Sequence, residues 1–315
     1  MNCSKPHILL FIILILAACA PTPEEMSNAA LKTFSEQIEI AATIQTEIDS
    51  IPTYMRGVWL CTYEETARYD DLTTEKSETL PCTVSVEYTD RFAVVSANGI
   101  PNHDFESGPG CCAEPQQYVW RIPLQPIMAS ESKFAPERGA VAISVNGVPF
   151  YGPEDGPGGD AVAAHHDYYV EDRQPISLGI CGGHAGPGGT YHYHYDASCV
   201  HWHPDEPETS WETWSTDLLQ DDEVSPVIGF AFDGHPIYGP YGYDTNGKLK
   251  EMASSYRLKQ GHTGQGGIDD WEYVKGLGDL DECNGLLSKI PASKEPTYHY
   301  HASIISGSGE IGFPY

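Results

Sequence analysis

Two histidine-rich segments carry the residues best suited to chemistry in this chain. Both Thr190 to His194 and Thr297 to His301 read Thr-Tyr-His-Tyr-His. Alternate side chains of a strand face opposite ways, so the histidines of each segment share one face and the tyrosines the other. Two imidazoles about 6.5–7 Å apart along one face can bind one ion through bonds of about 2.0–2.1 Å. We expect His192, His194, His299 and His301 to converge on a single ion.

Two further histidines are candidate ligands of the same ion. His103 follows an Asn-Gly turn, and His184 lies in a Gly-rich stretch shortly before His192. Imidazole-rich sites suit zinc, copper, nickel or iron, and export together with the many tyrosines favours copper, with zinc close behind. The alternative is structural: each histidine hydrogen-bonds loop backbone, and the tyrosine row fills a core.

The same series of motifs occurs twice in the chain, and each copy finishes with a histidine segment. Asn-Gly-Val-Pro-Phe-Tyr-Gly-Pro at 146–153 matches Asp-Gly-His-Pro-Ile-Tyr-Gly-Pro at 233–240. Each copy is followed by a cysteine with a nearby glycine and then by the Thr-Tyr-His-Tyr-His segment. A duplicated half-domain explains this order better than chance. We therefore expect two internal repeats, at about residues 140–195 and 227–301.

The segments that must position these motifs read as short strands. From Met55 onward, alternating or β-branched runs end in Asn-Gly or Asp-Gly pairs, which suit hairpin turns. The 31 glycines and 24 prolines also favour many short elements over long helices. We predict a mainly β, sandwich-like domain of two related halves over residues 55–315. A short amphipathic helix at 23–48, within a spacer at 19–54, precedes it and either packs on the domain or serves as a partner-binding spacer.

The first residues predict the compartment. Lys5 precedes an apolar run from Ile8 to Leu16, and Leu-Ala-Ala leads directly into Cys19. This arrangement resembles the lipobox of bacterial lipoproteins and implies a signal peptide at 1–18, cleavage before Cys19 and acylation of its thiol. The residue after Cys19 is not Asp, and by analogy with the sorting of bacterial lipoproteins this favours the outer membrane as the destination. The alternative is an ordinary cleaved signal with an incidental cysteine.

Export would place the remaining cysteines in an oxidising space. Their number is odd once Cys3 leaves with the signal and Cys19 carries lipid, so at least one is unpaired, ligates metal or bonds another chain. The sequence does not determine the connectivity, and adjacent cysteines can bond each other or two separate partners. The plausible local bridges are Cys61–Cys82 and Cys181–Cys199, and the adjacent pair is Cys111 and Cys112.

The net charge and the absence of several catalytic motifs argue against some classes of function. Lys plus Arg is 17 against 45 for Asp plus Glu, a net charge of −28, which argues against nucleic acid and against docking on an anionic leaflet. The sequence contains no Gly-x-Ser-x-Gly elbow, P-loop or dinucleotide fingerprint. A non-enzymatic alternative is a module that binds a glycan or an envelope protein through its 19 tyrosines and 6 tryptophans.

Several long strings of this sequence resemble the bacterial YHYH-domain proteins over about Arg91 to Pro314. The resemblance implies little function, because that family is largely uncharacterised. The chain departs from the pattern after Asn284-Gly285, where Leu286-Leu287 stand in place of an expected histidine, so the second half lacks a counterpart of His184. The strings are Ala97 to His103, Asn146 to Tyr151, Cys181 to His184, both Tyr-His-Tyr-His segments, Phe232 to Pro240 and Asp281 to Gly285.

Overall fold

The computed structural model describes residues 37, 39, 50–71, 76–107, 113–133, 135–136, 139–154, 156, 158–161, 178, 181–195, 199–200 and 223–309. The chain divides into two compact units, Met1–Ile51 and Pro52–Tyr315. The predicted signal peptide, Cys19, Cys111 and Cys112 lie outside the described residues, and of the predicted helix at 23–48 only residues 37 and 39 are described, both helical. Among the residues described, no helix combines the length and apolar character needed to cross a membrane.

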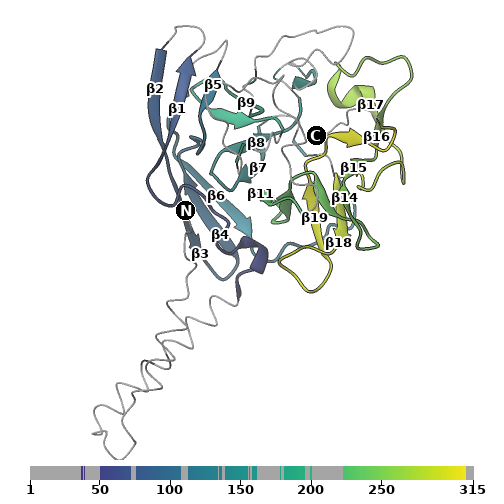
Figure 1. Cartoon of the computed structure of the whole chain (residues 1–315), viewed down its shortest axis with the longest axis horizontal. Helices are drawn as coiled ribbons and strands as arrows, with labels where there is room; N and C mark the ends of the chain where they lie inside the picture. The colour runs from purple at the N-terminus through teal and green to yellow at the C-terminus, as the bar shows by residue number, and fades with distance from the viewer. Residues whose placement is uncertain are drawn as a thin grey trace, which may run out of the picture. The chain divides into compact units, whose positions relative to one another are not determined.

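The second unit is built mainly of strands, as predicted (Figure 1). Its largest sheet has eight strands in the order β18-β19-β12-β11-β7-β8-β10-β9. The Thr-Tyr-His-Tyr-His segments contribute β10 and β19, each one strand in from an edge of this sheet. The strands are β7 (Ala140–Ser144), β8 (Pro149–Tyr151), β9 (Gly183–Ala185), β10 (Tyr191–Tyr193), β11 (Val227–Ala231), β12 (Pro236–Tyr238), β18 (Gly285–Ser288) and β19 (Thr297–His301).

The two ends of this sheet have the same connectivity. β7 and β8 form an antiparallel hairpin, β8 pairs with β10 in parallel, and β10 pairs with β9 in antiparallel. β11, β12, β19 and β18 repeat these pairings in the same order. The antiparallel β7–β11 pair joins the two ends at the middle of the sheet. A sandwich made of two related halves stays a prediction.

Smaller sheets complete the described part of the second unit. One three-stranded sheet has the order β2-β1-β5, another β3-β4-β6, and three further pairs are β13-β14, β15-β20 and β16-β17. The described 3₁₀ helices include η1 (Thr53–Met55) and η3 (Gly267–Asp270). The strands are β1 (Glu65–Asp71), β2 (Lys76–Cys82), β3 (Val84–Tyr88), β4 (Phe92–Ala97), β5 (Phe105–Ser107), β6 (Tyr118–Pro123), β13 (Tyr241–Tyr243), β14 (Leu249–Glu251), β15 (Ala253–Ser254), β16 (Tyr256–Leu258), β17 (Trp271–Tyr273) and β20 (Ile305–Ser306).

The Asn-Gly turn between β7 and β8 forms as its sequence predicts. Gly147 has a φ of 85°, and its amide donates to the carbonyl of Ser144 at 2.9 Å. A Cβ at Gly147 would lie 2.7 Å from carbons of Ala97 and Val84, so β3 and β4 pack directly against this turn. Glycine is needed here both for its positive φ and for the close approach.

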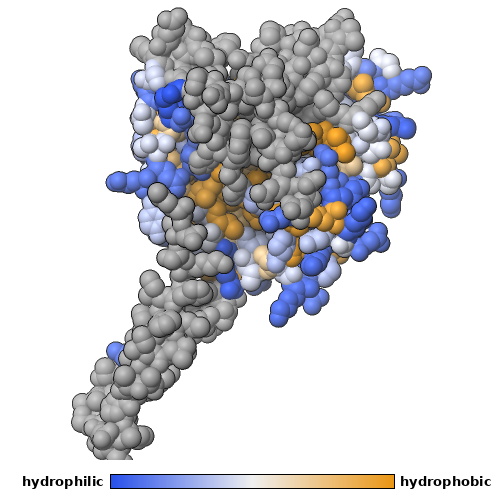
Figure 2. Space-filling model, in the orientation of Figure 1, coloured by the Kyte–Doolittle hydropathy of each residue, from blue (hydrophilic) through white to orange (hydrophobic). Residues whose placement is uncertain are grey.

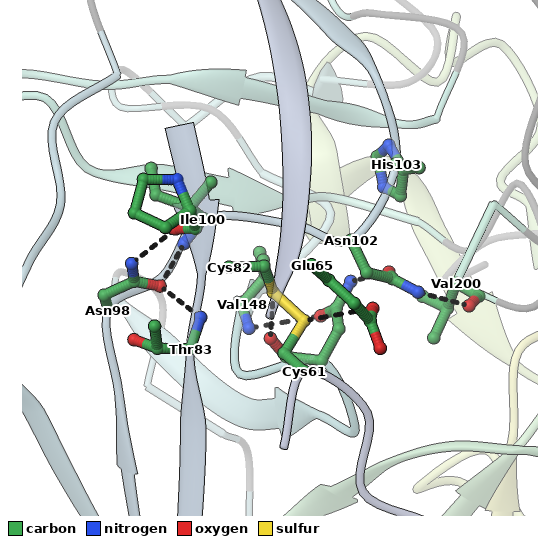
Figure 3. The surroundings of a disulfide bond; sticks show 12 residues. Cys61, Glu65, Cys82, Thr83, Asn98, Ile100, Asn102, His103, Val148 and Val200 are labelled. Carbon is green, nitrogen blue, oxygen red and sulfur yellow. Dashed lines mark hydrogen bonds between the residues drawn. A yellow bond between two sulfur atoms is a disulfide. The ribbon is translucent and has the colours of Figure 1, made fainter. Parts of the chain in front are cut away.

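Two disulfides form between the cysteines that sequence proximity suggested. Cys61 is bonded to Cys82 with their Cα atoms 5.5 Å apart, and Cys181 to Cys199 with Cα atoms 5.4 Å apart. Figure 3 shows the first bond near Asn98, whose side-chain oxygen accepts from the amides of Thr83 and Ile100. These bonds indicate an extracytoplasmic protein, because disulfides persist in oxidising compartments. Among the described cysteines, Cys283 is free.

The core lies around the middle of the large sheet. Ile143 and Phe230 pair across β7 and β11, and both are 0 % exposed. The Trp59 ring packs on Phe230 with a centroid distance of 5.2 Å. On the face shown in Figure 2, hydrophobic residues gather toward the middle while hydrophilic residues occupy much of the rim. The middle of the sheet is thus apolar, and the histidine segments lie on either side of it.

Candidate metal centre

Three histidines meet at the end of the sheet formed by β9 and β10. In this antiparallel pair His184 lies directly opposite His192, so both side chains project from the same face. His194, two residues beyond His192, continues on that face, and its amide donates to the carbonyl of Gly182 at 2.8 Å. The pairing of β9 with β10 therefore adds His184 to the two histidines that strand alternation had already placed together.

Close backbone packing beside His184 depends on a glycine. A Cβ at Gly183 would lie 2.7 Å from the Tyr191 hydroxyl and 2.7 Å from the carbonyl oxygen of His192. Real Cβ atoms do not approach other heavy atoms so closely, so any larger residue would push β9 away from β10. The Gly-Gly-His sequence thus allows the strand approach that brings His184 to the other two rings.

The ring nitrogens of the three histidines converge. The Nε2 atom of His184 lies 3.1 Å from that of His192 and 3.3 Å from that of His194. All three ligand atoms lie within 4.8 Å of one another. Bonds of about 2.0–2.1 Å from one ion to the nitrogen pairs at 3.1 and 3.3 Å would enclose angles of about 95–110°, which suits a tetrahedral site. Three protein ligands leave its fourth position open.

Backbone carbonyls orient two of these rings. The Nδ1 atom of His192 donates to the carbonyl of Thr190 at 3.0 Å, and Nδ1 of His194 donates to the carbonyl of Gly152 at 2.8 Å. A carbonyl only accepts, so this geometry assigns the proton of each neutral ring to Nδ1 and leaves Nε2 with a free lone pair. Metal-binding histidines are commonly oriented in this way.

Burial favours the neutral form of His192 and His194. His192 and His194 are 5 % and 6 % exposed, whereas His184 is half-buried. Burial lowers the pKa of His192 from 6.5 to about 4. Burial, and then the charged forms of His192 and His184, lower the pKa of His194 well below its usual value. Neutral imidazole is the form that ligates metal, so these two rings are in the metal-binding form at physiological pH. The Tyr151 ring stacks on His192 at a centroid distance of 3.9 Å.

The expectation that four histidines share one ion is wrong. Four strands, β8, β7, β11 and β12, separate β10 from β19 in the sheet. With the usual spacing between paired strands, the two segments lie on the order of 24 Å apart. The reason is that β7 and β11 pair at the centre of the sheet and place the histidine segments near its opposite edges. His299 and His301 instead form a pair of their own, with Nε2 atoms 3.1 Å apart.

His103 lies with the tyrosines rather than with the three histidines. Its Nε2 atom lies 2.6 Å from the Tyr193 hydroxyl, and its Nδ1 atom lies 2.8 Å from the Asp104 carbonyl. The Tyr193 hydroxyl also accepts from the side-chain amide of Asn146 at 2.9 Å. Since Tyr193 faces away from His192 and His194 on its strand, the structure gives His103 a place in a buried polar network.

The second half lacks a counterpart of His184, as its sequence predicted. Leu286 lies opposite His299 in the β18–β19 pair. His184, which we had treated as an additional ligand, is the one of the three whose Nε2 lies within hydrogen-bond distance of both others. The signal that points to it is the Gly-Gly-His string, whose glycines permit an antiparallel strand pair beside the histidine segment.

Comparison with families of known proteins gives one match. Residues 119–306 match the family model described as YHYH protein. This span covers more than half of the chain and includes the three-histidine cluster and the His299–His301 pair. No curated protein and no solved structure matches the chain.

Proposed function

The chain belongs to the YHYH protein family, and from this premise we propose that His184, His192 and His194 hold a copper or zinc ion in a bacterial envelope protein. The observation that carries the proposal is the convergence of three Nε2 atoms, at 3.1 and 3.3 Å from His184. The ion would serve a function outside the cytoplasm.

A purely structural role for the cluster leaves its polar atoms poorly satisfied. The Nε2 lone pairs of His192 and His194 both point at His184, whose Nε2 can donate at most one proton. One hydrogen cannot make two good bonds at once, whereas a cation would interact with all three lone pairs. Because unsatisfied buried acceptors are costly, the arrangement favours an ion over a set of histidine hydrogen bonds.

The ligand set determines what the bound ion can do. Three neutral imidazoles suit both zinc and copper, and zinc held by three histidines keeps a water in its fourth position. An ion in this cluster would polarise that water or bind a small oxygen donor. His184, as the partly exposed member of the cluster, would lie at the solvent side of the ion. Catalysis is no part of this proposal.

The envelope location rests on the disulfides and on the N-terminal sequence. Cys61–Cys82 and Cys181–Cys199 favour an oxidising compartment. The apolar run before Cys19 supports a signal peptide, a lipid anchor on Cys19 and the outer membrane as its destination. Labelling cells with a fatty-acid analogue tests the anchor: the full-length chain should be labelled and its Cys19→Ser variant should not. A labelled variant would contradict the assignment.

Metal content of the purified full-length chain tests the central proposal. The chain, in detergent, is incubated separately with zinc and with copper, freed of excess ion and analysed by mass spectrometry of its metals. A His192→Gln, His194→Gln variant should lose one bound ion relative to the unmodified chain. His262→Gln is the matched control, because that ring is partly exposed and pairs with Asp270.

Two outcomes would contradict the proposal. The double variant would retain as much metal as the unmodified chain, or the His262 control would lose as much as the double variant. Chelator-insensitive binding to a glycan array would then favour the alternative role of a recognition module.

A further inference from the structure

Four asparagines of the chain are followed directly by glycine. They are Asn98, Asn146, Asn246 and Asn284. An asparagine in this position can react with its own backbone. Because glycine has no side chain to shield its amide nitrogen, that nitrogen can attack the carboxamide carbon of the preceding asparagine. In an unfolded chain the four pairs should react at comparable rates, so the fold decides which of them reacts in the native protein.

Hydrogen bonds hold the carboxamides of Asn98 and Asn146. The oxygen of Asn98 accepts from two backbone amides, and its nitrogen donates to the Pro81 carbonyl at 2.6 Å. Asn146 is 0 % exposed, and its nitrogen donates to the side-chain oxygens of Asn102 and Tyr193 at 2.9 Å. A carboxamide must turn toward the next amide nitrogen before it reacts, so both side chains would first have to break these bonds.

Asn284 is held in a similar way. Its side-chain nitrogen donates to the His301 carbonyl at 2.9 Å and to the Ser303 hydroxyl at 3.0 Å, and the residue is 6 % exposed. The following glycine is enclosed as well, because a Cβ at Gly285 would collide with the Tyr298 hydroxyl. The fold therefore restrains this carboxamide and keeps water away from it.

Asn246 differs from the other three because it lies in the exposed turn between β13 and β14. A Cβ at Gly247 would meet no atom of the described residues within 4 Å. The Asn246 carboxamide interacts with the carboxylate of Asp244, which is partly exposed. The Gly247 amide donates to the Asp244 carbonyl at 2.9 Å, and the Asn246 amide donates to the Asp244 carboxylate at 2.8 Å. Hydrogen bonds in exposed turns open far more often than those of a packed core.

We propose that Asn246 is a site of spontaneous modification, at which the protein converts asparagine to aspartate and isoaspartate. The Gly247 nitrogen forms a bond to Cγ of Asn246, the bond from Cγ to Nδ2 breaks, and Nδ2 leaves as ammonia with the proton that the Gly247 nitrogen loses. A cyclic imide remains. Water then cleaves either the new bond to Cγ, which gives aspartate, or the original backbone bond, which gives isoaspartate. The reaction consumes one water, needs no cofactor and does not depend on the proposed function.

Both products change the β13–β14 hairpin. Each adds a negative charge beside Asp244, and isoaspartate also adds a carbon to the main chain inside the turn that joins the two paired strands. The first of these strands is packed in the fold, because a Cβ at Gly242 would lie 2.6 Å from Nε2 of His301. Modification at Asn246 would thus alter a hairpin that lies against the large sheet.

Peptide mass spectrometry of the full-length chain, aged in detergent and in mildly alkaline buffer made with isotopically labelled water, tests the proposal. Label enters the side chain or backbone only where an imide is hydrolysed, so earlier damage is not counted. Asn246 should take up label at least about tenfold faster than each of the other three asparagines, because those must first break buried or multiple hydrogen bonds. The chain aged in denaturant is the matched control, in which all four sites should react at similar rates.

Asn246→Gln is the matched variant, since its longer side chain does not form the same imide. It should lose the labelled product in this peptide and leave the slow labelling at Asn98, Asn146 and Asn284 unchanged. Equal or faster labelling at any of these three in the folded chain would overturn the proposal. So would an unlabelled Asn246 after a time in which the denatured chain has reacted completely.

Discussion

Leu286 lies opposite His299 at the same register position that His184 holds opposite His192. In both histidine pairs of this sheet each ring donates its Nδ1 hydrogen to a backbone carbonyl, and one pair has a third imidazole beside it where the other has a leucine. Because the third imidazole comes from a neighbouring strand rather than from the histidine segment itself, a single residue on β9 or β18 sets the number of imidazoles that meet there. This relationship leads to the first prediction.

Replacing His184 by leucine should make the first cluster resemble the second pair. We expect His184→Leu to weaken zinc binding at this place by more than about 100-fold, since a lost ligand costs more than a lost outer-shell partner. Competition against a zinc chelator measures the change, and His262→Leu controls for removal of a partly exposed histidine. Zinc binding that stays within about threefold of the parent would contradict the assigned role of His184.

Lowering the pH should destabilise the metal-free protein through its buried histidines. Burial lowers the pKa of His192 from 6.5 to about 4, so below pH 6.5 the unfolded chain binds a proton that the folded chain does not. The contribution is complete above pH 6.5 and is lost as the pH falls toward 4, by on the order of 3 kcal/mol.

Denaturant unfolding between pH 7 and pH 4 measures this dependence. The His192→Gln variant, which cannot titrate at this position, should show a shallower decline than the parent chain. Identical slopes for the two proteins would show that His192 titrates alike in the folded and unfolded states.

The two disulfides should have similar effects on stability and different effects on metal binding. Their sequence separations are 21 and 18, and removing either should lower the free energy of unfolding by about 3 kcal/mol. Cys181 directly precedes the Gly-Gly-His184 string, so Cys181→Ala, Cys199→Ala should also weaken metal binding about tenfold. The matched variant, Cys61→Ala, Cys82→Ala, should leave the metal affinity unchanged. Chemical denaturation and metal competition on both variants check the contrast.

Removing the Tyr193 hydroxyl should affect stability alone. This oxygen contacts His103 at 2.6 Å and Asn146 at 2.9 Å, on the face of β10 opposite the three-histidine cluster. Tyr193→Phe removes one hydrogen-bond partner from each of these two buried side chains and should cost about 1–3 kcal/mol. The number of bound ions should not change, as measured on the same samples. A loss of metal in Tyr193→Phe would mean that the two faces of the strand are coupled.

Local patterns alone determined several features of this protein. Strand alternation placed His192 with His194 and His299 with His301, because side chains two apart on a strand share a face. The positive φ of Gly147 followed from the Asn-Gly turn, and cysteine proximity suggested both disulfides. These features depend on neighbours in the chain, which is the information that a sequence carries directly.

Only the tertiary structure decided which histidines meet. Strand order is set by pairings between distant segments. Because β7 and β11 pair at the centre, the two histidine strands lie near opposite edges of the sheet. The pairing of β9 with β10 brought His184 beside His192, and the same pairing in the second half brought Leu286 beside His299. The alternation of side chains along a strand determines which face of the sheet each side chain is on. The pairing and register of neighbouring strands determine which residues lie beside it.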